Sequence, residues 1–161
     1  MSAIGSYEVL TRSKFAHCLA AARAVQTTMT GSGVFKRKRT TGLEEFRAMW
    51  KASLLKEVDF GYSAWALGQY LDAQRAINNR VLFDDESEIA GALAKVFTSA
   101  FVFETRMALP DLPGNQLEVY CRQEFAEDGP GVGESIVAAH TFYQLGLMEI
   151  TPENLVVFVI S

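Results

Sequence analysis

The chain has 161 residues, of which 49% are hydrophobic and 21% are charged, and its formal net charge at pH 7 is −4. These values exclude a disordered or fibrous protein and predict one globular domain over residues 1–161. The charge is unevenly divided, because residues 1–80 carry 12 Lys and Arg against 6 Asp and Glu, whereas residues 81–161 carry 3 against 13.

The first half of the sequence predicts helices. Apolar residues at intervals of three and four predict a helix over residues 13–29, which ends at a glycine-containing turn. A second apolar pattern starts at a Thr41–Glu44 capping box and predicts helices over residues 42–58 and 63–79, with a bend near Gly61.

A basic segment lies between the first two predicted helices. Lys36, Arg37, Lys38 and Arg39 follow one another there and predict an exposed loop. Such a loop can simply be solvated, contact phosphates or RNA, or bind an acidic surface, including the acidic half of this chain. The negative charge of the whole chain argues against a protein whose main role is to bind nucleic acid.

The second half adds a helix and a small β element. Carboxylates at the start of residues 84–101 predict a fourth helix with a wide apolar face. After Pro110 the pattern predicts a strand over residues 117–125, a helix over 134–147 and a strand over 155–160 that is buried on both faces. The predicted fold class is therefore helix-rich α+β, with about five helices, a helical part over residues 1–107 and a strand–helix–strand part over 108–161.

Two strands make a poor sheet, so a further partner is expected for the last strand. A third strand within residues 79–83 or 107–112 would provide it. Alternatively, Leu155–Ile160 pairs with another molecule and makes an oligomer.

No motif predicts catalysis, a metal or a cofactor. The glycine-rich loop over residues 128–135 has Glu134 where a phosphate-binding loop needs lysine. The two histidines and two cysteines lack the spacing of metal ligands, and the cysteines are expected to be buried thiols. These four residues are His17, His140, Cys18 and Cys121.

Two acidic groups lead to the preferred functional hypothesis. On a common surface they would steer a basic protein, such as a toxin or a nucleic-acid enzyme, toward this chain. The sequence therefore predicts a non-enzymatic interaction protein, of the inhibitor or immunity type. The partner-binding residues would be Asp84, Asp85, Glu86, Glu88, Glu124, Glu127, Asp128 and Glu134.

Two alternatives remain open. One is a small enzyme or ligand-binding domain with an aromatic pocket, and the other is a structural subunit or adaptor of a larger assembly. The aromatic pocket of the first alternative would be lined by Trp50, Tyr62, Trp65, Tyr70 and Tyr143.

The absence of a signal peptide pattern and of a bilayer-length apolar run predicts a cytoplasmic protein without membrane association.

Overall fold

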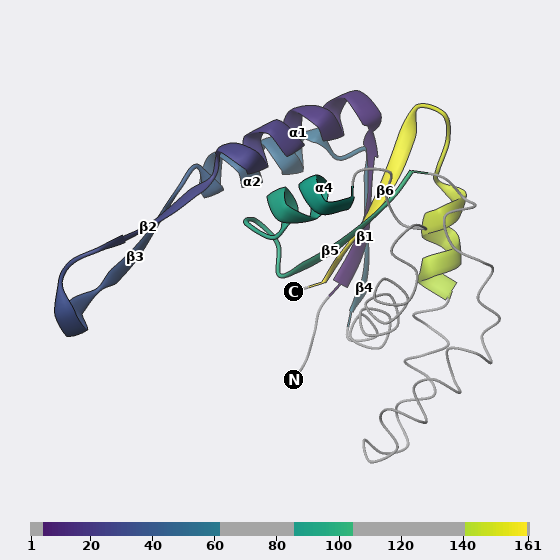
Figure 1. The fold of residues 1–161 in the computed structure, drawn as a ribbon. Helices are drawn as coiled ribbons and strands as arrows, with labels where there is room; N and C mark the ends of the chain where they lie inside the picture. The colour runs from purple at the N-terminus through teal and green to yellow at the C-terminus, as the bar shows by residue number, and fades with distance from the viewer. Residues whose placement is uncertain (1–4, 62–85, 105–140, 161) are drawn as a thin grey trace, which may run out of the picture.

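The structure is a computed structural model that describes residues 5–61, 86–104 and 141–160. Its centre is a four-stranded sheet in the order β4-β1-β6-β5, and every neighbouring pair is antiparallel (Figure 1). The strands are β1 (Gly5–Thr11), β4 (Lys56–Gly61), β5 (Ser99–Phe103) and β6 (Asn154–Ile160).

Strand β6 lies between β1 and β5. Val156 pairs with Val9 of β1 and with Phe103 of β5, so both hydrogen-bonding edges of β6 are occupied within the chain. The prediction of a buried C-terminal strand is confirmed, because Leu155 and its next three neighbours are all buried. Strand addition at Leu155–Ile160 therefore has no free edge to use.

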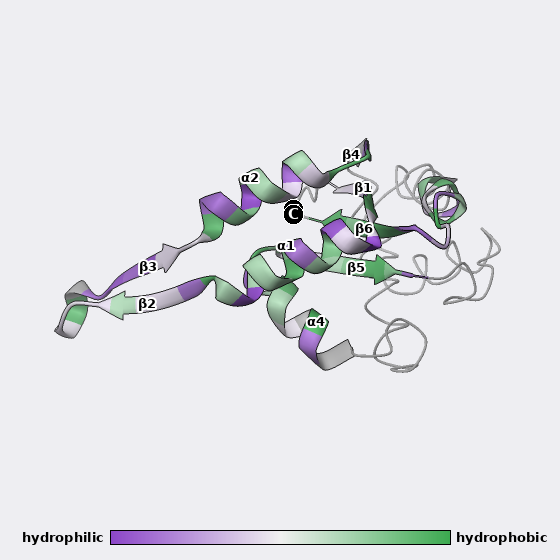
Figure 2. Cartoon of the chain, turned by 90° about the horizontal axis from the view of Figure 1, so that it is seen from above, coloured by the Kyte–Doolittle hydropathy of each residue, from purple (hydrophilic) through white to green (hydrophobic). Residues whose placement is uncertain are grey.

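Three helices cover one face of the sheet (Figure 2). They are α1 (Arg12–Ala24), α2 (Leu43–Ser53) and α4 (Glu86–Leu93). Thr11 caps the start of α1, because its hydroxyl accepts a hydrogen bond from the backbone N–H of Lys14 at 3.2 Å. The core between the helices and the sheet includes Leu10, Phe15, Phe46, Trp50 and Val157.

The other face of the sheet is covered by the helical residues 141–148. The rings of Tyr143 and Phe158 stack with centroids 5.7 Å apart, and Phe103 meets Phe158 edge-on at 5.4 Å. Gly146 lies against the Phe158 ring so closely that a Cβ at this position would be 2.6 Å from its Cζ. Close packing on both faces explains why β6 is so apolar.

The last element is a two-stranded antiparallel ribbon between α1 and α2. It consists of β2 (Gln26–Thr30) and β3 (Arg37–Thr41), joined through the short 3-10 helix η1 (Gly33–Phe35). Figure 1 shows the ribbon extending away from the sheet and the helices.

The predicted helix-rich fold class is therefore wrong. The fold is α+β around an antiparallel sheet, and three segments assigned to helices are strands. Residues 26–30 form β2 because threonine favours a strand, and residues 56–61 form β4 beside β1. Residues 99–103 form β5, since a short apolar run suits a buried strand as well as a helix.

Three smaller predictions also change. Three of the four basic residues, Arg37, Lys38 and Arg39, belong to strand β3 rather than to a loop, and Lys36 follows η1 directly before it. Gly42, with φ of +84°, is the N-cap of α2, so the Thr41–Glu44 capping box does not form. Strand β1 was missed, because the buried Glu8 interrupts its apolar pattern.

The predicted helix over residues 63–79 and the predicted strand over 117–125 lie outside the described residues, as do the two segments suggested for a third strand. Within the described residues, no helix is long and apolar enough to cross a membrane.

Candidate functional site

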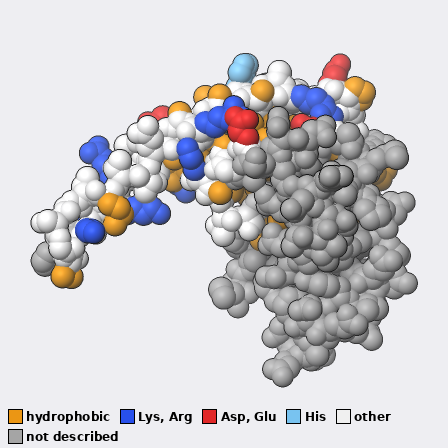
Figure 3. Space-filling model, in the orientation of Figure 1, with side chains coloured by type: hydrophobic (Ala, Val, Ile, Leu, Met, Phe, Trp, Pro, Cys, Tyr) orange, Lys and Arg blue, Asp and Glu red, His pale blue; other side chains and the backbone are white. Residues whose placement is uncertain are grey.

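The ribbon formed by residues 26–41, here called the basic arm, is the most distinctive surface feature of the described chain. It carries Lys36, Arg37, Lys38 and Arg39 and contains no acidic residue. Every residue of β2 is exposed, and Thr40 is the only partly buried residue of β3. Lysine and arginine side chains therefore lie along the arm with open access to solvent (Figure 3).

The arm is anchored at its base by the ends of two helices. Val25 follows α1, is buried, and its backbone N–H donates to the Ala22 carbonyl at 3.2 Å. On the returning strand, Gly42 leads into α2, where Phe46 is buried in the core. A two-stranded ribbon is only marginally stable alone, so the attachment of both strands to helices of the core helps to keep the ribbon folded.

Threonine hydroxyls tie the two strands together. The Oγ1 atoms of Thr27 and Thr40 are 3.2 Å apart across the ribbon. Thr30 Oγ1 donates to the Arg37 carbonyl at 3.3 Å, and Thr28 Oγ1 donates to the Arg39 carbonyl at 3.5 Å. Such cross-strand bonds support a ribbon that has no apolar core of its own.

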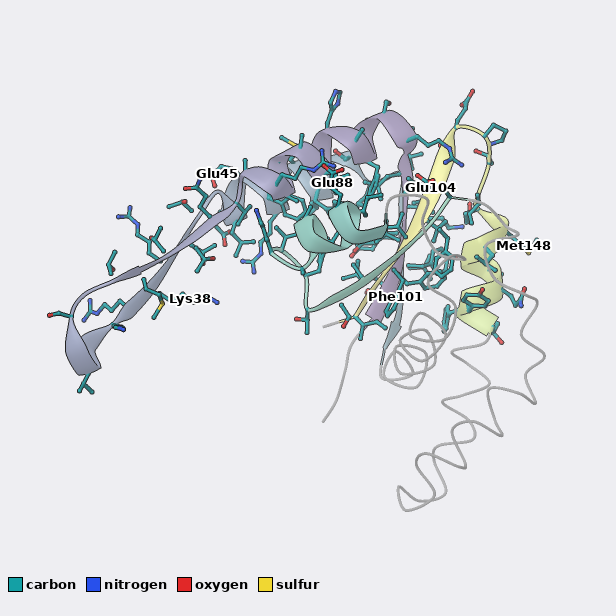
Figure 4. The ribbon with its side chains drawn as sticks, viewed as in Figure 1. Lys38, Glu45, Glu88, Phe101, Glu104 and Met148 are labelled. Carbon is teal, nitrogen blue, oxygen red and sulfur yellow. The ribbon has the colours of Figure 1, made fainter. Side chains whose placement is uncertain are left out.

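Basic side chains occupy both faces of the arm. Residues directly opposite each other in an antiparallel pair share a face, and successive residues alternate between faces. Arg37 and Arg39 pair with Thr30 and Thr28, whereas Lys38 pairs with Met29 on the opposite face. Lys38 is labelled in Figure 4, where its side chain extends from the ribbon.

The outer end of the arm is distant from the acidic groups of the body. The strands have 5 residues each. At about 3.3 Å per residue, the five positions from Thr41 to Lys36 span about 16 Å. This is about twice the Debye length at physiological ionic strength, which is about 8 Å. Charges on the body are therefore largely screened from Lys36 and Arg37.

The predicted acidic surface is only partly described. Glu88 forms an ion pair with Arg23 of α1 at 2.8 Å, so one of its members is neutralised within the chain (Figure 4). Glu86 begins α4, but its side chain lies outside what the structure describes. The hypothesis of a binding surface for a basic protein stays a prediction. The remaining members lie outside the described residues, namely Asp84, Asp85, Glu124, Glu127, Asp128 and Glu134.

The structure does not bring the other candidate residues together where it describes them. His17 is exposed on α1, and Cys18 is buried with its thiol donating to Ser53 Oγ at 3.6 Å. Trp50 and Tyr143 lie on opposite faces of the sheet, so they do not line one pocket. In the described ranges, no cluster of three or more His, Cys, Asp and Glu side chains could hold a metal ion. Other candidates lie outside those ranges, namely Tyr62, Trp65, Tyr70, Cys121 and His140.

The structure also contains a buried carboxylate that the sequence did not predict. Glu8 of β1 is 6% exposed and accepts hydrogen bonds from Trp50 Nε1 at 2.5 Å and Ser6 Oγ at 3.2 Å. Burial raises the pKa of Glu8, while these two hydrogen bonds oppose the increase. Because the carboxylate is enclosed between β1 and α2, it is part of the core rather than an accessible site.

The basic arm had a signal in the sequence that the helical pattern obscured. Two threonine-containing runs, residues 26–30 and 37–41, flank a segment with Gly31 and Gly33. Such runs around a glycine-containing turn are typical of a β-hairpin.

Comparison with known proteins yields no match: no protein family, no curated protein and no solved structure is significantly similar to this chain.

Proposed function

We propose that the basic arm binds the phosphate backbone of double-stranded DNA. The observation that carries this proposal is the placement of cations on both faces of an exposed two-stranded ribbon. Lysine and arginine supply the phosphate contacts that dominate the affinity of most DNA-binding proteins.

The two-faced distribution favours a groove over a flat surface. A membrane or a flat acidic protein surface can contact only one face of the arm, either that of Arg37 and Arg39 or that of Lys38. A DNA groove has phosphates along both walls and can engage both faces together. The major groove of B-DNA is about 12 Å wide and admits a two-stranded ribbon.

Duplex DNA fits the arm better than RNA or single strands. The major groove of A-form RNA is too narrow for side chains to enter. Proteins that bind single strands rely on several aromatic side chains for successive base stacking, and residues 26–41 contain a single aromatic residue, Phe35.

The net charge of the chain opposes this function less than the sequence suggested. The whole chain has a net charge of −4, but the arm alone carries four basic and no acidic residues. Since its outer cations lie about two Debye lengths from the base of the ribbon, they act as a local positive site at physiological salt.

Fluorescence anisotropy with a labelled DNA duplex tests the proposal. If all four cations contact phosphates, the plot of log K against log salt has a slope of about −3.6. The double variant R37A/R39A should reduce the slope by about 1.8, and K36A/K38A should do the same. Because the four residues are exposed, circular dichroism should show that these variants keep the wild-type fold.

The matched control is K14A/K51A, which removes the same charge from exposed positions on α1 and α2. Its slope should equal that of the wild-type protein. The proposal fails if DNA does not bind, or if K14A/K51A weakens binding as much as R37A/R39A does. Preferential binding to an RNA duplex, single-stranded DNA or anionic vesicles would also contradict it.

A further inference from the structure

The tip of the basic arm differs in chemistry from its strands. Gly31, Ser32, Gly33 and Val34 are uncharged, and Val34 is 97% exposed. Gly31 and Gly33 have φ of +107° and +65°, a conformation that suits glycine and turns the chain at the tip of the arm. Val34, which precedes Phe35 in η1, thus carries an apolar side chain that contacts almost nothing in the described chain.

The spacing of the tip and the cations matches the depth of a groove. Val34 lies in η1, where the rise is about 2 Å per residue, and the chain from Phe35 to Arg37 is extended at about 3.3 Å per residue, so Arg37 lies about 9 Å behind Val34. The major groove of B-DNA is about 8.5 Å deep. An arm that enters tip first therefore brings Val34 to the groove floor when the basic residues behind it reach the phosphates at the rim.

The floor of the major groove offers one apolar group, the C5-methyl of thymine, and the minor groove has no equivalent. The minor groove of undeformed B-DNA is only about 6 Å wide, so a two-stranded ribbon enters it only at the cost of deforming the DNA. Building on the proposed function, we propose that Val34 contacts thymine methyl groups in the major groove, so that the arm prefers thymine-containing duplexes.

Two duplexes that differ only in their methyl groups test this preference. One contains thymine, and in the other uracil replaces every thymine, which removes the methyl groups and keeps the base pairing. The wild-type protein should bind the thymine duplex about fourfold more tightly for each methyl group buried by Val34. Val34→Ser should bind both duplexes equally, and Val34→Ile should keep the preference.

A second pair of duplexes checks that the methyl group itself is recognised. Replacing cytosine by 5-methylcytosine in a duplex of G·C pairs adds a methyl group at the corresponding place in the major groove. The wild-type protein should gain affinity from this change, and V34S should not.

The results separate this inference from the proposed function. Equal binding of the thymine and uracil duplexes, with salt-dependent binding that R37A/R39A weakens, would overturn the role of Val34 and leave phosphate binding intact. An unchanged thymine preference in V34S would also overturn it. If the wild-type protein shows no salt-dependent binding to either duplex, the proposed function itself is contradicted. R37A/R39A should weaken binding to both duplexes by the same factor and preserve their ratio.

Discussion

The indole Nε1 of Trp50 donates a hydrogen bond to Oε2 of Glu8 at 2.5 Å, and this bond joins α2 to an inner strand of the sheet. Ser6 Oγ donates to the other carboxylate oxygen at 3.2 Å. A buried carboxyl group held by two donors links the pH of the solution to the stability of the core.

Glu8→Gln should stabilise the protein at neutral pH. The pKa of Glu8 is raised in the folded state, chiefly by burial, so the folded state binds this proton more tightly than the unfolded state does. The free energy of unfolding therefore falls as pH rises from the unfolded-state pKa to the raised pKa, and this loss is complete above it. E8Q avoids the loss, and its gain at pH 7 should be about 1.4 kcal/mol for each unit of increase.

Urea denaturation at two pH values measures this effect. At about pH 3.5, below the unfolded-state pKa of about 4.3, E8Q and the wild-type protein should differ little. The exposed Glu153 provides a control, since E153Q should change stability by less than about 0.5 kcal/mol at both pH values. A gain for E8Q that is the same at both pH values would contradict the titration argument.

Trp50→Phe should destabilise the protein by about 1–3 kcal/mol at pH 7, because it leaves the buried Glu8 without its indole donor. The effect should depend on Glu8. A double-mutant cycle with Glu8→Leu, which removes the acceptor, should give a coupling energy above about 0.5 kcal/mol. Additive effects would mean that Trp50 acts only by packing against Phe46 and Phe97.

Gly146→Ala should destabilise the protein by about 1–3 kcal/mol, because the new Cβ would overlap the ring of Phe158. The control is Gly91→Ala in α4, where nothing lies within 4 Å of the added Cβ. G91A should gain about 0.5–1 kcal/mol from helix propensity. Thermal denaturation should show a lower melting temperature for G146A and a higher one for G91A. Phe158→Leu should reduce the loss of stability that G146A causes.

Replacing residues 27–40 by Asn-Gly should leave the body of the protein folded. Gln26 and Thr41 are paired across the ribbon, so a two-residue turn can join them. The removed side chains are nearly all exposed, and the free energy of unfolding should change by less than about 0.5 kcal/mol. A large loss of stability would show that the arm contributes to the core.

The sequence identified those elements whose pattern has one structural explanation. The run over residues 155–160 is too apolar and β-branched for an exposed segment, and it was predicted as a buried strand. The helical spacing of Phe15, Leu19 and Ala22 likewise predicted the buried face of α1, which the structure confirms.

Other elements were missed because a second pattern competed with the correct one. Met29 continues the helical spacing of α1 but is 61% exposed on the arm, so its apolar side chain misled the prediction. In β1, Glu8 occupies a core position that the period-two pattern would give to an apolar residue. Only the position of Trp50 on α2 explains a carboxylate there, and that contact is between residues 42 positions apart.

The four cations were recognised from sequence, but their arrangement was not. Four consecutive basic residues have the same composition in a loop and in a strand. Their division between two faces depends on the pairing of β3 with β2, which fixes the register of Lys38 opposite Met29.

The middle of the sheet joins segments from distant parts of the chain. Val9 of β1 pairs with Val156 of β6, which is 147 positions later in the sequence. Contacts over such separations are slow to form, because a long loop must close before they add stability. During synthesis on the ribosome, β1 must therefore wait without its inner partner until β6 has emerged. Over that interval its apolar side chains are open to chaperones and to misassociation.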